Sequence, residues 1–548
     1  MSLQPCPAFE IPEETRRVAC AAFPRGTLCL RIADALGGLY QDADFADLFP
    51  RCGQPAASPA RLAWVTILQF VENLSDRAAA DAVRGRVDWK YLLGLELSDP
   101  GFDHTVLSEF RARLTGGEAE RRLLDTLLAR LREMHLLQAR GRQRTDSTHI
   151  LAAVRTLNRL ERVGETLRTA LNAVADAAPD WLAALAPPSW YERYARRVEN
   201  FRLPAAKSER ERLAAEIGAD GQTLLDAIAA APAGARLAAL PEVGTLRQVW
   251  EQQYRRDEDA LAWRSGDELS ALVQRIESPY DPEARYSTKR SVDWVGYKVH
   301  LSETCESDAP RVITHVETTA ATVPDVKALP DVHRALARAD LLPAKHLVDK
   351  GYTSPQVVLD SQQRDGVCVI GPLGEDTSWQ ARAGKGFDKA HFLIDWEAQR
   401  ATCPAGCLSQ TWKPKTGVPG IETQVRFSAR DCRSCPHRAD CTKSKTSARI
   451  VLLQSRECHE ALREARLTQT SETFEQEYAA RAGVESTHAQ AIRRSGLRTC
   501  RYIGLAKTRL QHIATAVALD LVRVCEWLDG TPVAPTRRSR FARLQQAA

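Results

Sequence analysis

The sequence predicts a multidomain protein of the α/β class, with a helical N-terminal region followed by a core built on a mixed sheet. Three observations indicate this. Apolar residues recur at helical spacing through the first 140 residues. Short β-rich segments alternate with helical runs from about residue 142 to 370. A length of 548 residues also exceeds what one compact core holds.

The composition is that of an ordinary globular chain, 44% hydrophobic and 26% charged. The net charge of +5 does not by itself require a polyanionic partner, so any nucleic-acid signal must be local. Residues 1–17 contain glutamates and no apolar stretch, unlike a secretory signal. The most apolar run, 513–528, is interrupted by Asp520, Arg523 and Glu526 and indicates an amphipathic helix. We therefore expect a cytoplasmic protein with no membrane partner and no structural disulfides.

Residues 1–140 are expected to form a helical domain. Ser58-Pro59 is typical of a helix start, because the hydroxyl can cap the helix and proline suits its first position. Further helical runs surround Trp89 and follow the turn at Pro100-Gly101, and the last of these is rich in arginine. This domain could place a basic helix in a DNA groove, or it could be a cap that only adds stability.

A strand is expected over residues 142–150, where β-branched and polar residues alternate. Asp146 lies in the middle of this strand, although aspartate is poorly suited to strands. A residue that departs from the strand preference in this way is expected at functional sites. Residues 151–279 return to a helical pattern, broken by prolines at 187–188, 204 and 232, and we find no chemistry there.

The later strands are expected to complete the sheet. The β-rich runs 294–301 and 311–316 should pair as a hairpin, and a helix over 326–339 should lead into a buried strand that ends at Asp349. Another strand is expected over 366–370. Two strong helices should follow near the end of the chain, over 472–494 and 503–528.

Three acids stand out by their positions. Asp146 lies within a predicted strand and Asp349 ends another. Glu485 lies on the helix predicted over 472–494, where Tyr478 and Arg481 share its face. Carboxylates that converge from separate elements supply the hard oxygen ligands that two magnesium ions need for in-line phosphoryl transfer. Taken singly, each acid is more often a solvated side chain.

Four stretches of the chain resemble the DDE transposases of bacterial insertion sequences, in the group with a helical N-terminal domain and a cysteine-bearing insertion. The stretches are residues 62–114, the sequence Thr145-Asp146-Ser147-Thr148, residues 281–352, and residues 478–485. The last contains Tyr478, Arg481 and Glu485 in the family's Tyr/Arg/Glu signature.

The resemblance implies an RNase H-like (retroviral integrase-type) catalytic core in which Asp146, Asp349 and Glu485 bind two Mg²⁺ ions. The implied domains are a DNA-binding domain over 1–140, a core over 141–150, 280–370 and 471–530, a helical insertion over 151–279, a Cys-rich insertion over 371–470, and a basic tail over 531–548.

The resemblance also implies the reaction. The enzyme would cut DNA at the terminal inverted repeats of the element and join the ends to target DNA, as a homodimer or higher synaptic assembly. Family members often carry a lysine seven residues after the glutamate, but here that position is Ile492. Arg493 or Arg494 would then be the basic partner of the DNA phosphate.

A run without acidic residues, from Ser486 to Leu519, indicates a DNA-binding surface, although a solvated helix face remains the alternative. The DNA-binding candidates are Tyr478, Arg481, Arg493, Arg494, Arg498 and Lys507. Gly483 costs about 1 kcal/mol relative to alanine inside a helix. This glycine indicates either the close approach of a strand or DNA, or a tolerated defect.

Five cysteines cluster in the Cys-rich insertion: Cys403, Cys407, Cys432, Cys435 and Cys441. Paired thiols on loops that contain glycine or proline suit a structural Zn²⁺ ion, with two ligands from the first two cysteines and two from the last three. Five thiols for four places leave the set unassigned. Free buried thiols are the alternative interpretation.

Two other functions remain open. One is an inactive or domesticated transposase that acts as a DNA-binding protein, against which the presence of all three acids argues. The other is an RNase H-type nuclease, which would cut DNA independently of the repeat sequence.

Overall fold

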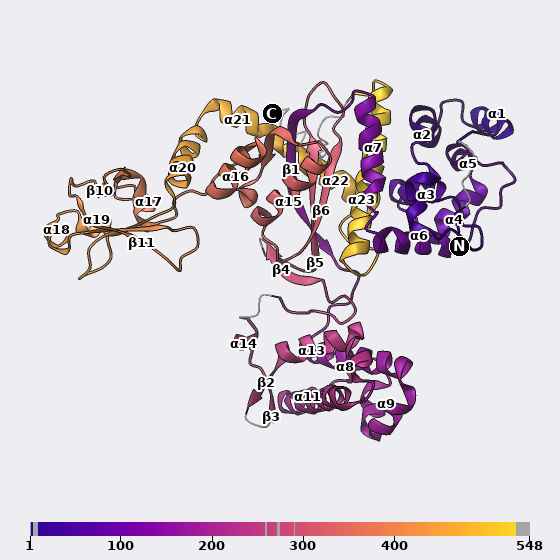
Figure 1. Cartoon of the computed structure of the whole chain (residues 1–548), viewed down its shortest axis with the longest axis horizontal. Helices are drawn as coiled ribbons and strands as arrows, with labels where there is room; N and C mark the ends of the chain where they lie inside the picture. Colours follow the sequence, from indigo (N-terminus) through magenta and orange to yellow (C-terminus); the bar gives the residue numbers. More distant parts are fainter. Residues whose placement is uncertain (1, 4–8, 258–259, 271–273, 290, 533–548) are drawn as a thin grey trace, which may run out of the picture.

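The computed structural model describes residues 2–3, 9–257, 260–270, 274–289 and 291–532. Most of the predicted basic tail over 531–548 lies outside these residues. Figure 1 shows the N-terminal helices beside a central sheet, a helical lobe below the sheet, and an arm extending to the left. The lobe and the arm therefore interrupt the sheet-bearing part in sequence and project from it in space.

The central sheet is mixed, as the sequence predicted. Its strands are β1 (Arg140–Leu151), β4 (Arg285–Lys289), β5 (Val292–Thr304), β6 (Ile313–Ala320), β7 (Pro343–Val348) and β8 (Cys368–Ile370). β1 pairs antiparallel with β5 on one side and parallel with β7 on the other. β7 pairs parallel with β8, while β4 and β6 both pair antiparallel with β5. The predicted β5–β6 hairpin is therefore confirmed.

β1 is a buried central strand although most of its residues are polar. The side chains of Gln143 and Thr145 are buried, and each has a hydrogen-bond partner. Gln143 Nε2 donates to the Leu341 carbonyl at 2.8 Å, and Thr145 Oγ1 lies 2.6 Å from both Ser302 Oγ and His346 Nε2. A polar strand is stable in this position because its neighbours satisfy its buried polar groups.

The N-terminal helices follow the sequence prediction. They are α1 (Glu13–Ala22), α2 (Leu28–Leu36), α3 (Pro59–Glu72), α4 (Asp76–Gly85), α5 (Val87–Leu93), α6 (Thr105–Gly116) and α7 (Arg122–Glu133), with a 3-10 helix η1 (Asp42–Leu48). The Ser58 side chain accepts the Arg61 N–H and caps α3, which begins at Pro59 as predicted. Almost every residue of α3 is buried, so this helix is the centre of the N-terminal core.

α23 (Leu505–Leu528) joins the N-terminal helices to the sheet by packing against α3 and β6. The expectation of an amphipathic helix over 513–528 is wrong, because α23 is buried around most of its circumference. Its polar residue Asp520 is 0% exposed and accepts the Ile313 N–H at 2.8 Å. Among the described residues, no helix is both long and apolar enough to cross a membrane.

The helical lobe has its own hydrophobic core. Its helices are α8 (Arg159–Ala177), α9 (Pro179–Leu185), α10 (Pro188–Tyr194), α11 (Lys207–Ala230), α12 (Gly234–Ala238), α13 (Pro241–Gln253) and α14 (Gly266–Ser270). A short 3-10 helix, η2 (Asn200–Arg202), precedes α11. The predicted proline breaks all fall between helices or at the start of one, as at Pro188. A hairpin of β2 (Tyr254–Asp257) and β3 (Ala260–Trp263) was not predicted.

The arm holds two small sheets. The strands are β9 (Leu393–Asp395), β10 (Arg400–Thr402), β11 (Ser409–Pro414), β12 (Thr423–Phe427) and β13 (Ile450–Leu453). Its short helices are α17 (Trp379–Ala383), η4 (Lys389–His391), α18 (Ala429–Ser434) and α19 (Arg438–Cys441), and α20 (Arg456–Thr468) leads back toward the sheet.

The prediction of a single helix over 472–494 is wrong. The segment forms α21 (Glu472–Ala479), a 3-10 turn η5 (Ala480–Ala482) and α22 (Gly483–Ser495). The physical reason lies outside the segment, since the Arg144 guanidinium on β1 donates to the Ala480 carbonyl. That carbonyl is thereby drawn away from the regular helical hydrogen-bond pattern, and the two helices meet at this point.

Candidate active site

The first two predicted acids lie on neighbouring parallel strands. Thr145 on β1 is in register with Val348 on β7, the last residue of that strand. The residues that follow, Asp146 and Asp349, are therefore neighbours across the strand pair. Two carboxylates far apart in the sequence meet at the end of β7.

Asp146 is largely removed from water, with a side chain 14% exposed. Its Oδ1 accepts the Ser147 N–H at 2.7 Å, and its Oδ2 accepts Arg481 Nη1 at 3.2 Å. Burial, and next the neighbouring Asp349 carboxylate, raises the pKa of Asp146 to about 6. A desolvated carboxylate beside a second one is an environment that favours a bound cation.

Asp349 begins the 3-10 helix η3 (Lys350–Tyr352) and accepts the Gly351 N–H at 2.7 Å. A β-carbon at position 351 would lie 3.0 Å from Asp349 Oδ1 and 3.2 Å from Asp325 Oδ2. Glycine at this position therefore leaves room for two carboxylates that flank it, one of which the sequence analysis had not considered.

Asp325 is the functional candidate that the sequence analysis missed. It begins α15 (Asp325–Arg338), the helix predicted over 326–339. Its Oδ2 accepts Ser147 Oγ at 3.1 Å, and its Oδ1 accepts Lys298 Nζ at 3.0 Å. Burial opposes ionisation of Asp325, but Lys298 and His300 outweigh it and lower the pKa of Asp325 overall. Two features of the sequence could have identified Asp325. It lies directly before the predicted helix, and its partner Lys298 lies in the stretch 281–352 that resembles the transposases.

Glu485 lies on the first turn of α22, with a side chain 64% exposed. It does not contact Asp146 directly. Arg481 joins the two, since its Nη2 donates to Glu485 Oε1 at 2.7 Å and its Nη1 to Asp146. His488 Nε2 lies 3.3 Å from the Asp146 carbonyl, so Arg481, Glu485 and His488 share one face despite the helix break. Tyr478 stacks on Phe474 with ring centroids 5.5 Å apart.

A buried ionic network positions α22 against the sheet. Glu303 on β5 is 0% exposed and pairs with Arg144 on β1 and Arg523 on α23. The second carboxylate oxygen of Glu303 also accepts Thr487 Oγ1 on α22 at 2.6 Å. Four elements meet at this carboxylate, so the helix that carries Glu485 is fixed relative to the strand that carries Asp146.

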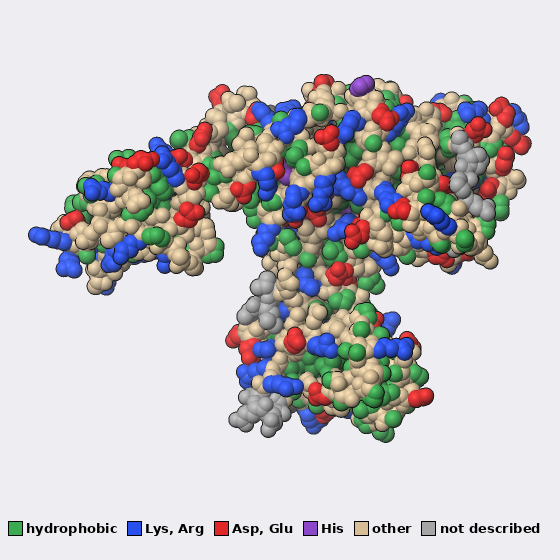
Figure 2. Space-filling view, in the orientation of Figure 1, with side chains coloured by type: hydrophobic (Ala, Val, Ile, Leu, Met, Phe, Trp, Pro, Cys, Tyr) green, Lys and Arg blue, Asp and Glu red, His purple; other side chains and the backbone are tan. Residues whose placement is uncertain are grey.

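The predicted DNA-binding residues differ in their surroundings. Arg493, Arg494 and Lys507 are exposed. Arg494 donates to the Val71 carbonyl of α3 at 3.1 Å, and Arg498 donates to Thr148 Oγ1 at 3.0 Å, so both hold protein segments together. Ile492, at the position where a lysine was expected, packs against the main core. Figure 2 shows Lys and Arg side chains gathered on the visible face of the part that holds the central sheet.

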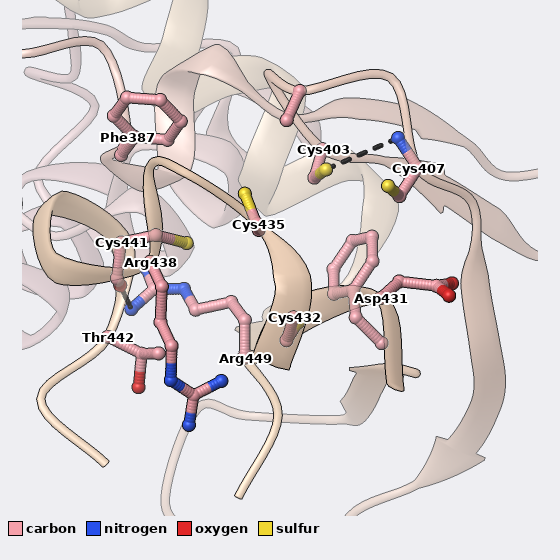
Figure 3. A pocket seen from close by; sticks show the side chains of 12 residues that line it. Phe387, Cys403, Cys407, Asp431, Cys432, Cys435, Arg438, Cys441, Thr442 and Arg449 are labelled. Carbon is pink, nitrogen blue, oxygen red and sulfur yellow. Dashed lines mark hydrogen bonds between the residues drawn. The ribbon is translucent and has the colours of Figure 1, made fainter. Parts of the chain in front are cut away.

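The five predicted cysteines lie together in the arm. Cys403, Cys407, Cys432, Cys435 and Cys441 line one cavity, shown in Figure 3. Cys403 and Cys407 flank a loop after β10, while the other three lie on or next to α18 and α19. All five are free thiols.

Neither the acid site nor the cysteine cavity is preformed for an ion. Within the part of the chain that the structure describes, no three His, Cys, Asp or Glu side chains are gathered closely enough to hold a metal. In the acid site, Arg481 is the cation between Asp146 and Glu485.

Two segments of the chain match known protein families. Residues 402–525 match the family described as Transposase DDE domain. Residues 19–113 match the family described as Transposase domain (DUF772). The first segment includes the arm cysteines, Arg481 and Glu485, and the second includes most of the N-terminal helices. No curated protein and no solved structure matches the chain.

Proposed function

Because the two family matches indicate a DDE transposase of an insertion-sequence type, we propose that the chain cleaves DNA at the ends of such an element and joins those ends to target DNA. The observation that carries this proposal is the pairing of β1 with β7, which brings Asp146 beside Asp349. Arg481 links this pair to Glu485 on a third element. DNA is the partner that the transposase families imply.

The sheet supports an RNase H-like catalytic core. The strands follow the spatial order β6-β5-β1-β7-β8, with the antiparallel hairpin strands on one side of β1 and the parallel strands on the other. A ligand site of such an α/β sheet is expected beyond the carboxyl ends of its strands. Asp349 lies at the end of β7, which is consistent with that expectation.

The residues present fit a pair of Mg²⁺ ions. Asp146 and Asp349 form a partly desolvated, like-charged pair, and Arg481 links the exposed Glu485 carboxylate to Asp146. Asp146, Asp349 and Glu485 would hold the ions, which supply Lewis acidity to the attacking and leaving oxygens of an in-line phosphoryl transfer.

The chain's own residues bind and orient the DNA strand in this proposal. Arg481, released from the carboxylates, binds a phosphate beside the scissile bond. The ring of Tyr478 contacts the same strand in this proposal. Arg493 and Lys507 bind phosphates farther away, and Asp325 and Ser147 orient Asp146. The N-terminal helices over 1–140 bind the terminal repeat, and two chains assemble to bind both ends of the element.

The proposal is tested by strand cleavage of a labelled duplex that carries the element's terminal repeat, in the presence of Mg²⁺. We expect wild-type protein to nick at the repeat end and leave a 3′-hydroxyl, and Asp349→Asn to abolish nicking. Asp360→Asn is the matched control, because Asp360 lies on α16 (Pro355–Asp365) and bonds only locally to Gln356.

The alternatives give different results in the same experiment. Repeat-specific binding without nicking by wild-type protein, under both Mg²⁺ and Mn²⁺, would identify a DNA-binding protein descended from a transposase. Nicking that is equal on a scrambled duplex would identify a nuclease without repeat specificity.

A further inference from the structure

The cavity among the arm cysteines has the size and the side chains of a zinc site. It encloses about 30 Å³, the space of a single small ion or water, and five thiols line it (Figure 3). The thiols come from two separate segments, the loop after β10 and the short helices α18 and α19. Four cysteines contributed in pairs by loops and short helices are a common tetrahedral set for structural zinc.

Three of the five thiols are anchored in the fold of the arm. Cys403, Cys432 and Cys441 pack against the core of the arm.

Cys407 has a different role in this group. Its backbone N–H donates to Cys403 Sγ at 3.3 Å, and its carbonyl accepts the Cys403 N–H at 2.9 Å. An amide N–H directed at a ligand sulfur helps to orient that sulfur toward a metal. The loop therefore orients Cys403 as a ligand through hydrogen bonds with the backbone of Cys407.

Two arginines at the cavity supply an independent observation. Arg438 and Arg449 both line it, and Arg438 Nη1 and Arg449 Nε are buried donors with no acceptor among the described residues. An unpaired buried donor costs about 1–3 kcal/mol. Four thiolates around one Zn²⁺ carry a net charge of −2, so two guanidinium groups balance that charge and gain sulfur acceptors.

The arm has little else to hold it together. Its buried core consists of six residues: Phe392, Ala401, Val425, Phe427, Val451 and Leu453. Cores of this size are typically supplemented by a metal or disulfides, and the arm cysteines are free thiols.

We propose that Cys403, Cys432, Cys435 and Cys441 bind one structural Zn²⁺ ion as thiolates, with Arg438 and Arg449 as charge partners. The four thiols release their protons to solvent on binding. Because no ligand set is preformed in the described residues, the ion draws the thiols inward and fixes α18 and α19 to the arm sheets. This inference concerns the arm alone and does not rest on the catalytic proposal.

The test is elemental analysis of the full-length protein, purified without strong chelators. We expect one zinc per chain, and a loss of at least half of it in each of the four single Cys→Ser variants. Cys407→Ser, which keeps the backbone bonds, and Cys368→Ser, an exposed thiol outside the arm, should retain it. The cobalt-substituted protein should show the visible absorption bands of a tetrahedral thiolate site.

A wild-type measurement keeps the test independent of variant folding. Titration of thiols with a mercurial reagent should release zinc in step with the modification of four cysteines per chain. Wild-type protein with well under one zinc per chain overturns the proposal. Full zinc in Cys432→Ser together with its loss in Cys407→Ser overturns the ligand assignment.

Discussion

Arg144 on β1 lies directly against Gly483 on α22, so that a β-carbon at position 483 would come within 2.0 Å of Arg144 Nη1. The guanidinium is not free to move away, because its Nε donates to Glu303 Oε1 at 2.7 Å and its Nη1 donates to the Ala480 carbonyl. This contact sets the spacing between the strand that bears Asp146 and the helix that bears Glu485. It is also the close approach by a strand that was one of the explanations for a glycine in this helix.

Gly483→Ala should therefore destabilise the protein. The added methyl group forces Arg144 out of its ion pair with Glu303 or pushes α22 away from β1, and we expect a loss of about 1–3 kcal/mol. Gly244→Ala is the matched control, since Gly244 lies in α13 and a β-carbon there meets nothing within 4 Å. Thermal unfolding of both variants checks the prediction. An unchanged or raised melting temperature for Gly483→Ala would show that Arg144 can relax.

The elements themselves could be predicted from the sequence wherever the signal is local. The Ser58 cap, the proline breaks and the strand that ends at Asp349 are all defined by neighbouring residues, and the structure has them. The break at 480–482 could not be predicted, because its cause is a residue more than 300 positions away. Asp325 was missed for the same reason, since its partners Ser147 and Lys298 become neighbours only in the folded sheet.

The burial of α23 was not predicted from the sequence for a different reason. Asp520, Arg523 and Glu526 have the spacing of a polar face. Arg523, however, points to the buried Glu303, and Asp520 accepts a backbone N–H of β6. The sequence alone does not distinguish a charged side chain that is solvated from one that pairs with a buried group.

Glu303→Gln should be strongly destabilising. The substitution leaves Arg144 and Arg523 without their shared carboxylate, and breaking a buried ion pair from one side costs roughly 3–5 kcal/mol. Denaturant unfolding at neutral pH measures this loss. Glu457→Gln, at an exposed position on α20, is a control that leaves the network intact. A loss of under about 1 kcal/mol for Glu303→Gln would show that the network does not hold α22 in place.

The same carboxylate should contribute to acid sensitivity. Burial opposes ionisation of Glu303, but Arg523 and Arg144 outweigh it, so the pKa of Glu303 is lowered in the folded protein. The resulting stability is complete above the unfolded pKa of about 4.3 and is lost as the pH falls toward the lowered folded pKa. The unfolding free energy of wild type should fall more steeply below that pH than that of Glu303→Gln. Parallel pH profiles would contradict this.

Asp325→Asn should reduce cleavage more than it reduces DNA binding. The variant weakens the ion pair with Lys298 and the acceptor for Ser147, and outer partners of this kind typically contribute about 10–100-fold. Cleavage rates at saturating DNA, together with binding measured in Ca²⁺, separate the two effects. Asp331→Asn, on the exposed side of the same helix, is the control. An equal fall in binding and cleavage would assign Asp325 a purely structural role.

Arg493→Gln and Lys507→Gln should weaken DNA binding without changing stability, because both side chains are exposed. Each phosphate contact that is lost should reduce the slope of log affinity against log salt by about 0.9. Arg494→Gln should instead lower the melting temperature, since Arg494 bonds to the Val71 carbonyl and joins α22 to α3. Salt-dependent binding and thermal unfolding of the three variants test this division. A full salt slope in both exposed variants would remove Arg493 and Lys507 from the DNA surface.

Arg481→Gln should increase the affinity of the acid site for divalent ions. Arg481 is the cation that now pairs with both Asp146 and Glu485, so an ion that uses these carboxylates must displace it. Glutamine keeps part of the hydrogen bonding but removes the competing charge. We expect a lower Ca²⁺ or Mg²⁺ concentration at half-maximal thermal stabilisation, measured without DNA so that catalysis does not enter. Arg382→Gln, in the arm, is the control. A half-maximal concentration that stays constant or rises would mean that Arg481 positions Glu485 for the ions rather than competing with them.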